Sequence, residues 1–153
     1  MEDIKRILVV SRMTKHCQKA VHYGVTLAQK FGAELYVIHA VHDPLTFGIW
    51  NLPKPSLEVE YKKELDTVKR DLDAIINTEK EKGMSIKEII KEGEATQEIL
   101  QTVKQEKIDL IIMLAHEEWR LEHFLFGRST EEIVRKMPCS VFLVKEELSR
   151  AAV

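Results

Sequence analysis

Short apolar runs alternate along the whole chain with longer segments of helical periodicity. The runs Ile7–Val10, Leu35–Ile38, Ile108–Leu114 and Ser140–Val144 contain few or no charged positions, as is typical of strands covered on both faces. Residues 85–91 instead mix isoleucines with charged side chains, which predicts a half-covered strand at a sheet edge. We therefore predict five strands.

Four segments between these strands repeat apolar residues every three or four positions, as amphipathic helices do. The first covers residues 14–31 and ends at Gly32, and the longest runs from Leu57 up to Gly83; glycine commonly closes a helix because it tolerates a positive φ. Residues 94–106 and 129–136 form two shorter helices, and Pro138 stops the second. Residues 42–56 hold three of the four prolines together with several apolar side chains, which predicts a loop that packs on another part of the protein.

Strands that alternate with helices predict an α/β fold. Crossover connections between parallel strands are almost always right-handed and place helices on both faces of the sheet. We predict a doubly wound sheet of five parallel strands in the order 3-2-1-4-5, numbered along the chain, with the half-polar segment 85–91 at one edge. Ligands in such sheets bind beyond the carboxyl ends of the strands, where the strand order reverses. Functional residues are therefore expected after residues 10, 41 and 114.

Composition and charge exclude several classes of protein. The chain has 153 residues, 44% of them apolar, which suits one domain with one core. Its 23 basic and 25 acidic residues give a formal charge of -2, without the basic excess that nucleic-acid binding needs. Cys17 and Cys139 lie far apart, which suits a reducing compartment. The longest wholly apolar run, Leu110–Ala115, is too short to span a bilayer, so we expect a cytoplasmic protein that binds neither nucleic acid nor membrane.

The strand ends lack the common phosphate-binding motifs. Neither G-x-G-x-x-G nor G-x-x-x-x-G-K-[ST] occurs, so the usual dinucleotide and P-loop cradles are absent. A response-regulator receiver would need acidic residues after the first strand to hold magnesium, and this chain has Ser11 and Arg12 there.

Several segments carry a family resemblance. They are Lys5–Val10 at the start, Val37–Val41 at the second strand, the step from Leu114 to Gly127, the helix from Ser129, and the ending Pro138-Cys139-Ser140-Val141. In these segments the chain resembles the universal stress protein family over nearly its whole length. The resemblance implies a family domain over residues 1–146 with a tail at 147–153, and a Rossmann-like sandwich similar to that of the adenine-nucleotide alpha-hydrolases.

Nucleotide-binding members of that family carry the motif G-x2-G-x9-G-[ST] after the fourth strand. The resemblance places its four specified positions on Leu114, Glu117, Gly127 and Arg128, so only one glycine remains. A Glu117 carboxylate about 4 Å from a phosphate oxygen would be repelled by roughly 4 kcal/mol at an effective dielectric near 20. The acidic residue that such members carry after the first strand corresponds to Arg12. We therefore predict that the protein needs no nucleotide cofactor.

The predicted function is that of a universal stress protein that acts as a non-catalytic, dimeric binding or regulatory module. No nucleophile elbow or catalytic pair is recognisable, so we do not expect an enzyme. The alternative is an ATP- or AMP-binding switch of the same fold with slow hydrolysis. In that case the resemblance assigns the ligand to seven positions: Ser11, Arg12, Ala40, Met113, Gly127, Ser129 and Thr130.

Four histidines follow or belong to the second and fourth strands: His39, His42, His116 and His123. With the acidic residues near them they could hold zinc or respond to pH. However, Arg120 stands where an H-E-x-x-H motif needs its second histidine, which favours polar, solvated loops and no metal. A metal- or pH-sensing module stays a third alternative.

The last strand predicts a homodimer. Its residues Ser140, Val141, Phe142, Leu143 and Val144 are apolar on both faces, and an edge strand of this kind needs a partner for its free N–H and C=O groups. The family resemblance implies the same pairing.

Two loops and one cysteine have alternative interpretations. The apolar residues around Trp50 and Trp119 either cover the end of the sheet or offer a patch to a protein partner. Cys139 is more simply a small residue entering the last strand than a reactive thiol.

Overall fold

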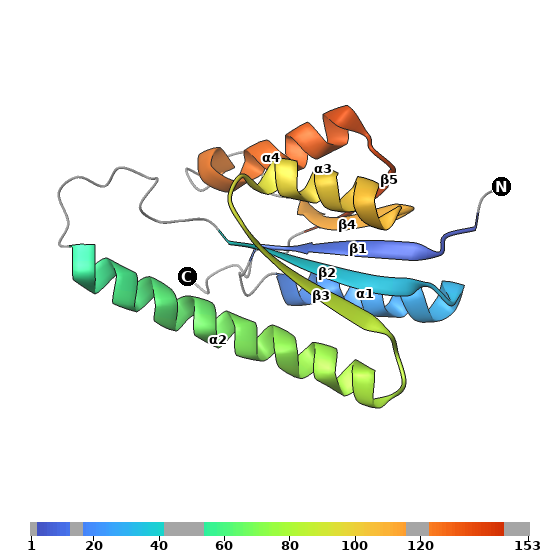
Figure 1. Ribbon diagram of the computed structural model, residues 1–153, viewed down its shortest axis with the longest axis horizontal. Helices are drawn as coiled ribbons and strands as arrows, with labels where there is room; N and C mark the ends of the chain where they lie inside the picture. Colours follow the sequence, from blue (N-terminus) through green and yellow to red (C-terminus); the bar gives the residue numbers. More distant parts are fainter. Residues whose placement is uncertain (1–2, 13–16, 42–53, 116–122, 146–153) are drawn as a thin grey trace, which may run out of the picture.

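The computed structural model describes residues 3–12, 17–41, 54–115 and 123–145. Strands and helices alternate along the chain, as predicted (Figure 1). The elements in order are β1 (Arg6–Ser11), α1 (Cys17–Phe31), β2 (Glu34–Val41), α2 (Lys54–Glu81), β3 (Ile86–Glu92), α3 (Ala95–Glu106), β4 (Leu110–Ala115), α4 (His123–Lys136) and β5 (Ser140–Lys145).

The strands form one parallel sheet in the order β3-β2-β1-β4-β5, which confirms the predicted topology. The most apolar strands, β1 and β4, lie in the interior of the sheet, and the half-polar β3 lies at one edge. β5 forms the other edge. The strand order reverses between β1 and β4, so the carboxyl ends of these two strands mark the predicted ligand-binding region.

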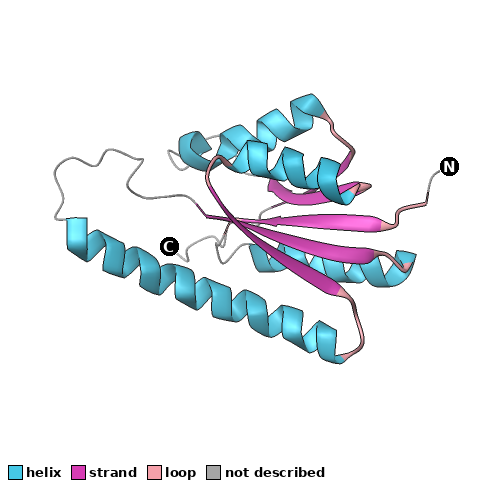
Figure 2. Cartoon of the chain, viewed as in Figure 1, coloured by secondary structure: helices cyan, strands magenta, loops and turns pink. Residues whose placement is uncertain are grey.

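Helices cover both faces of the sheet (Figure 2). The helices α1 and α2 lie on one face and α3 and α4 on the other (Figure 1). Alternate residues of β1 feed the two cores: Ile7 and Val9 pack with α1 and α2, whereas Leu8 and Val10 pack with α3 and α4. This division follows from the period of two along a strand.

Two helices begin earlier than the sequence pattern predicts. The longest helix starts at Lys54 instead of Leu57, with Pro55 in its first turn, where the missing N–H of proline costs nothing. Helix α4 starts at His123 instead of Ser129. The prediction that this helix covers only residues 129–136 was therefore wrong at its start, because a single glycine, Gly127, costs a helix only about 1 kcal/mol and does not end it.

One carboxylate joins the starts of β1 and β4. Asp109 Oδ2 accepts hydrogen bonds from the backbone N–H groups of Lys5 and Arg6, both at 2.9 Å. The two central strands are thereby held in register at the end of the sheet opposite the predicted ligand region. In the described part of the chain, no helix combines the length and the apolar character needed to cross a membrane.

Candidate functional site

Four of the seven predicted ligand positions lie near the carboxyl ends of β1, β2 and β4. They are Ser11, Arg12, Ala40 and Met113, and they are between 0% and 9% exposed. Met113 belongs to the core beneath α3 and α4. The topology thus brings these positions together at the carboxyl end of the sheet. Their side chains, however, are little exposed to an incoming ligand.

Arg12 places a buried positive charge directly after β1. Its backbone N–H donates to Cys17 Sγ at 3.2 Å, which links the end of β1 to the start of α1. Burial lowers the pKa of the Arg12 guanidinium to about 10, against the opposing effects of Cys17 and Glu94. The group is still charged at neutral pH, so the sign of the charge is opposite to that of the acidic residue that the family resemblance implies here.

The fourth-strand motif positions are divided between a strand and a helix. Leu114 is 6% exposed and belongs to the core on the α1 and α2 side of the sheet, paired with Val144 of β5. The remaining ligand positions Gly127, Ser129 and Thr130 lie within α4, and Glu117 lies outside the described residues. The assignment of a ligand to these positions stays a prediction.

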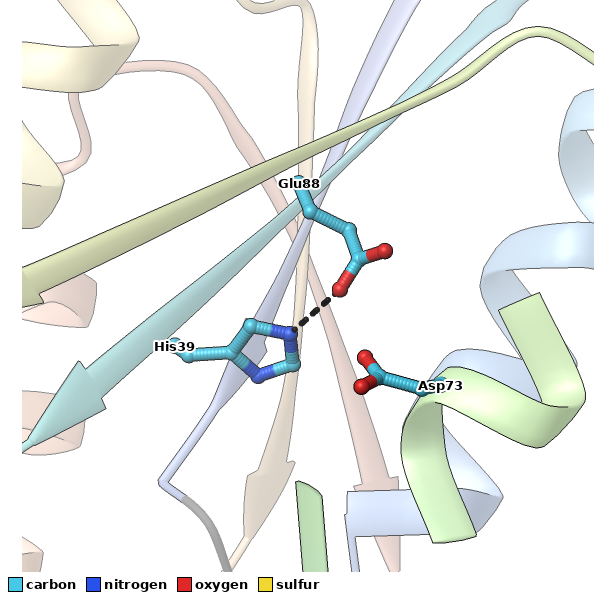
Figure 3. A group of neighbouring side chains, drawn as sticks. All are labelled: His39, Asp73 and Glu88. Carbon is cyan, nitrogen blue, oxygen red and sulfur yellow. Dashed lines mark hydrogen bonds and ion pairs between the residues drawn. The ribbon is translucent and has the colours of Figure 1, made fainter. Parts of the chain in front are cut away.

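A second group of polar side chains lies between β2, β3 and α2. His39, on β2, is 1% exposed, and its Nε2 lies 3.2 Å from Oε2 of Glu88 on β3. Asp73, on α2, completes the group: one ligand atom of each residue can be chosen so that all three lie within 4.8 Å of one another. Figure 3 shows both carboxylates directed toward the imidazole.

Two lysines neutralise the outer oxygens of these carboxylates. Lys69 Nζ lies 2.7 Å from Asp73 Oδ2, and Lys80 Nζ lies 3.5 Å from Glu88 Oε1. Each carboxylate therefore keeps one oxygen that no lysine contacts among the described residues. Asp73 Oδ1 and His39 Nδ1 are both buried without a hydrogen-bond partner in the described part of the chain.

The protonation states of the group follow from burial and from these contacts. Burial lowers the pKa of His39, although the hydrogen bond and the charge of Glu88 oppose this effect; the imidazole is therefore neutral at pH 7. Burial would raise the pKa of Asp73, but its contacts with Lys69 and Glu88 outweigh burial and lower it. At neutral pH the group consists of a neutral imidazole and an ionised Asp73 beside Glu88.

The sequence pattern located only part of this group. The expectation that the histidines lie in solvated loops was wrong for His39, whose side chain faces the core under α1 and α2; His42 and His116 lie outside the described residues, and His123 opens α4. Glu88 and Asp73 were not anticipated. In the sequence, Glu88 is marked only by its position two residues after Ile86, which is buried on the same face of β3. Asp73 is marked only by its position directly after the buried Leu72 of α2.

The other predicted contact regions are only partly described. The loops around Trp50 and Trp119 lie outside the described residues. Cys139 is partly buried and packs against the core under α3 and α4, in agreement with its interpretation as a small residue at the entry to β5.

Comparison with known proteins identifies similar chains. The model of the family described as "Universal stress protein family" matches residues 3–145. A universal stress protein of Methanocaldococcus jannaschii is 28% identical over 148 residues, which cover 93% of this chain and 82% of the relative.

Solved structures show the same fold. The universal stress protein UspA from Lactobacillus plantarum superposes with a TM-score of 0.64 at 22% identity, over 94% of this chain and 99% of that one. A universal stress protein from Archaeoglobus fulgidus, solved in complex with dAMP, gives a TM-score of 0.55 at 17% identity, over 95% of this chain and 100% of that one.

Proposed function

Because the chain belongs to the universal stress protein family, we propose that it is a non-catalytic, homodimeric binding or regulatory module of the stress response. In this proposal it works in the cytoplasm and does not depend on ATP. The observation that carries ATP independence is the buried side chain of Leu114, at a position where the nucleotide-binding motif of the family has glycine.

Leu114 opposes nucleotide binding through its shape. A glycine at this position would let backbone N–H groups approach a phosphate closely, whereas the leucine side chain packs into the core at the end of β4. Removing the side chain would leave a cavity in that core, so the end of β4 cannot turn the leucine away without a loss of stability. Glu117 adds a charge of the wrong sign for a phosphate.

Titration calorimetry with ATP tests this part of the proposal. The native chain is expected to show no saturable binding below about 100 μM, a threshold equivalent to about 5.5 kcal/mol of binding free energy. Leu114→Gly combined with Glu117→Gly should increase the affinity, with Arg12→Asp and Arg128→Ser added in a second variant. Glu117→Gln alone removes the charge without changing the backbone freedom, and is expected to restore little. A native dissociation constant in the low micromolar range, or nucleotide retained through purification, would contradict ATP independence.

The exposed edge of β5 supports the homodimer. Phe142 and Leu143 are 38% and 45% exposed, and Phe142 packs against Tyr23 of α1, with ring centroids 5.6 Å apart. In the described sheet β5 pairs only with β4, so its outer N–H and C=O groups are available to a second copy. A continuous sheet through two β5 strands would pair these groups and cover both apolar side chains.

Sedimentation equilibrium at tens of micromolar tests the dimer. The native chain is expected to have the mass of a dimer, and Leu143→Lys that of a monomer. Ile90→Lys is the matched control, because Ile90 is 54% exposed on β3, the opposite edge strand, and should leave the dimer intact. Val141 is a less clean target because it packs against the core. A monomeric native chain, or a Leu143→Lys variant that stays dimeric, would overturn the proposed interface.

The second candidate function is an adenine-nucleotide switch. Two observations favour it: the similar fold of the Archaeoglobus fulgidus protein solved with dAMP, and the buried positive charge of Arg12 near the end of β1, which could pair with a phosphate. Saturable binding of AMP or ATP by the native chain that Arg12→Met abolishes would replace ATP independence with this candidate.

A further inference from the structure

We propose that His39, Asp73 and Glu88 form a binding site for a divalent transition-metal ion of the Zn²⁺ class, located between the sheet and α2. The three residues come from β2, α2 and β3, so a bound ion would connect the long helix to the two strands beneath it. His39 lies beside Ser11 of β1 in the sheet, but none of the three residues is among the seven positions assigned to a nucleotide, so the proposal goes beyond the proposed function.

The donor atoms suit such an ion. Zn²⁺ binds imidazole nitrogen at about 2.0–2.1 Å and carboxylate oxygen at about 2.0–2.2 Å, and two ligands of a tetrahedral ion are then roughly 3.4 Å apart. The 3.2 Å between His39 Nε2 and Glu88 Oε2 is close to that separation. The three donor atoms lie within 4.8 Å of one another, so tetrahedral coordination requires them to move closer by rotation of the Asp73 and Glu88 side chains, which are 30% and 21% exposed.

The distribution of hydrogen bonds leaves this centre incomplete without an ion. Each lysine contacts the outer oxygen of one carboxylate, while Asp73 Oδ1 is buried without a partner among the described residues. A buried polar atom without a partner costs about 1–3 kcal/mol. An ion bound by Asp73 Oδ1, Glu88 Oε2 and His39 Nε2 would give the orphaned carboxylate oxygen a partner.

The mixed nitrogen and oxygen ligands also decide which ion is preferred. Mg²⁺ and Ca²⁺ favour oxygen ligands alone, whereas one imidazole with two carboxylates suits Zn²⁺. Three protein ligands leave a fourth position for water. Asp73 lines a groove along α2 and Glu88 is 21% exposed, so two of the three ligand residues are in contact with solvent.

Lys69 should compete with the ion. Its ammonium occupies Asp73 Oδ2 at 2.7 Å and is 39% exposed, so it can move into solvent when an ion binds, but its charge repels the ion in either position. Replacing Lys69 by methionine removes that charge and keeps a side chain of similar length. The site therefore predicts tighter metal binding for Lys69→Met, which a surface cluster elsewhere on the chain does not predict.

The test is Zn²⁺ titration of the full, metal-stripped chain, monitored by calorimetry, with thermal unfolding as a second readout. The native chain is expected to bind one Zn²⁺ at this site and to unfold at a higher temperature with the ion present, and Mg²⁺ should have neither effect. Asp73→Asn and Glu88→Gln should each weaken the binding at least tenfold, and Lys69→Met should strengthen it. Circular dichroism establishes that each variant is folded.

Matched controls separate this site from other metal-binding side chains. Asp66→Asn changes a carboxylate that lines the same groove but is not part of the group, and His22→Gln changes an exposed histidine on α1. Both should leave Zn²⁺ affinity unchanged. Absence of Zn²⁺ binding to the native chain would overturn the proposal, and so would binding that Asp73→Asn and Glu88→Gln leave unchanged.

Discussion

Gly24 is the position where helix propensity and packing make opposite predictions. It lies in the middle of α1, where alanine is favoured over glycine by about 1 kcal/mol. In the folded chain, however, a Cβ at Gly24 would overlap Val9 Cγ2 of β1 and lie 3.2 Å from Leu35 Cδ1 of β2. Both neighbours are fully buried, so neither can move without disturbing the core under α1.

Packing should outweigh propensity in Gly24→Ala. Inserting a methyl group into a filled core costs about 1–3 kcal/mol, and the gain in helix propensity offsets about 1 kcal/mol of this. We expect the free energy of unfolding to fall by about 1–2 kcal/mol. For a chain of this size each kcal/mol corresponds to roughly 2–4 °C, so the unfolding temperature should fall by several degrees.

Denaturant unfolding at one fixed protein concentration measures this change, because any self-association makes apparent stability depend on concentration. A double-mutant cycle with Val9→Ala identifies its cause: without the Val9 methyl groups, Gly24→Ala should cost at least about 1 kcal/mol less. His22→Ala compared with His22→Gly, on the exposed face of α1, reports the difference in helix propensity between alanine and glycine, because both variants lack the imidazole. A Gly24→Ala variant more stable than the native chain, or a cycle without coupling, would refute the argument.

Three further predictions concern single side chains. Glu94 caps α3 by accepting backbone N–H bonds; burial would raise the pKa of Glu94, but these bonds outweigh it and lower the pKa. The cap therefore stabilises the fold above the ordinary carboxyl pKa, and this stabilisation is lost as pH falls through the lowered pKa of Glu94. Glu94→Ala should lower the free energy of unfolding by about 1 kcal/mol at pH 7. A loss of stability in this variant that persisted unchanged in acid would count against the cap. Burial raises the pKa of the Cys139 thiol to about 11, so in a Cys17→Ser variant alkylation at pH 8 should be roughly a hundredfold slower than for an ordinary thiol; a rate equal to that of free cysteine would contradict this. Asp109→Ala should lower the free energy of unfolding by about 1–3 kcal/mol, because two backbone N–H groups lose their acceptor. Asp109→Asn keeps an oxygen at this position and should lose less stability. Equal losses of stability in urea titrations of the two variants would contradict the role of that oxygen.

The fold could be predicted because the hydrophobic pattern reports burial directly. A strand covered on both faces must be apolar at every position, and Ile7–Val10 has this pattern. An edge strand tolerates charged side chains, and residues 85–91 contain several. The strand order then follows from a few rules of connection. The start of α4 could not be read in the same way, because Gly127 in a helix and Gly127 in a loop look alike in the sequence.

The chemistry of the site depended on tertiary structure to a much greater degree. The sequence alone placed Arg12 directly after β1, and the family resemblance implied that Leu114 stands in place of a glycine. It did not show that His39, Asp73 and Glu88 converge, because they belong to three elements whose distances are set by strand register and by how α2 lies on the sheet. Local periodicity determines which face a side chain takes, whereas only the packed structure determines which side chains meet across that face.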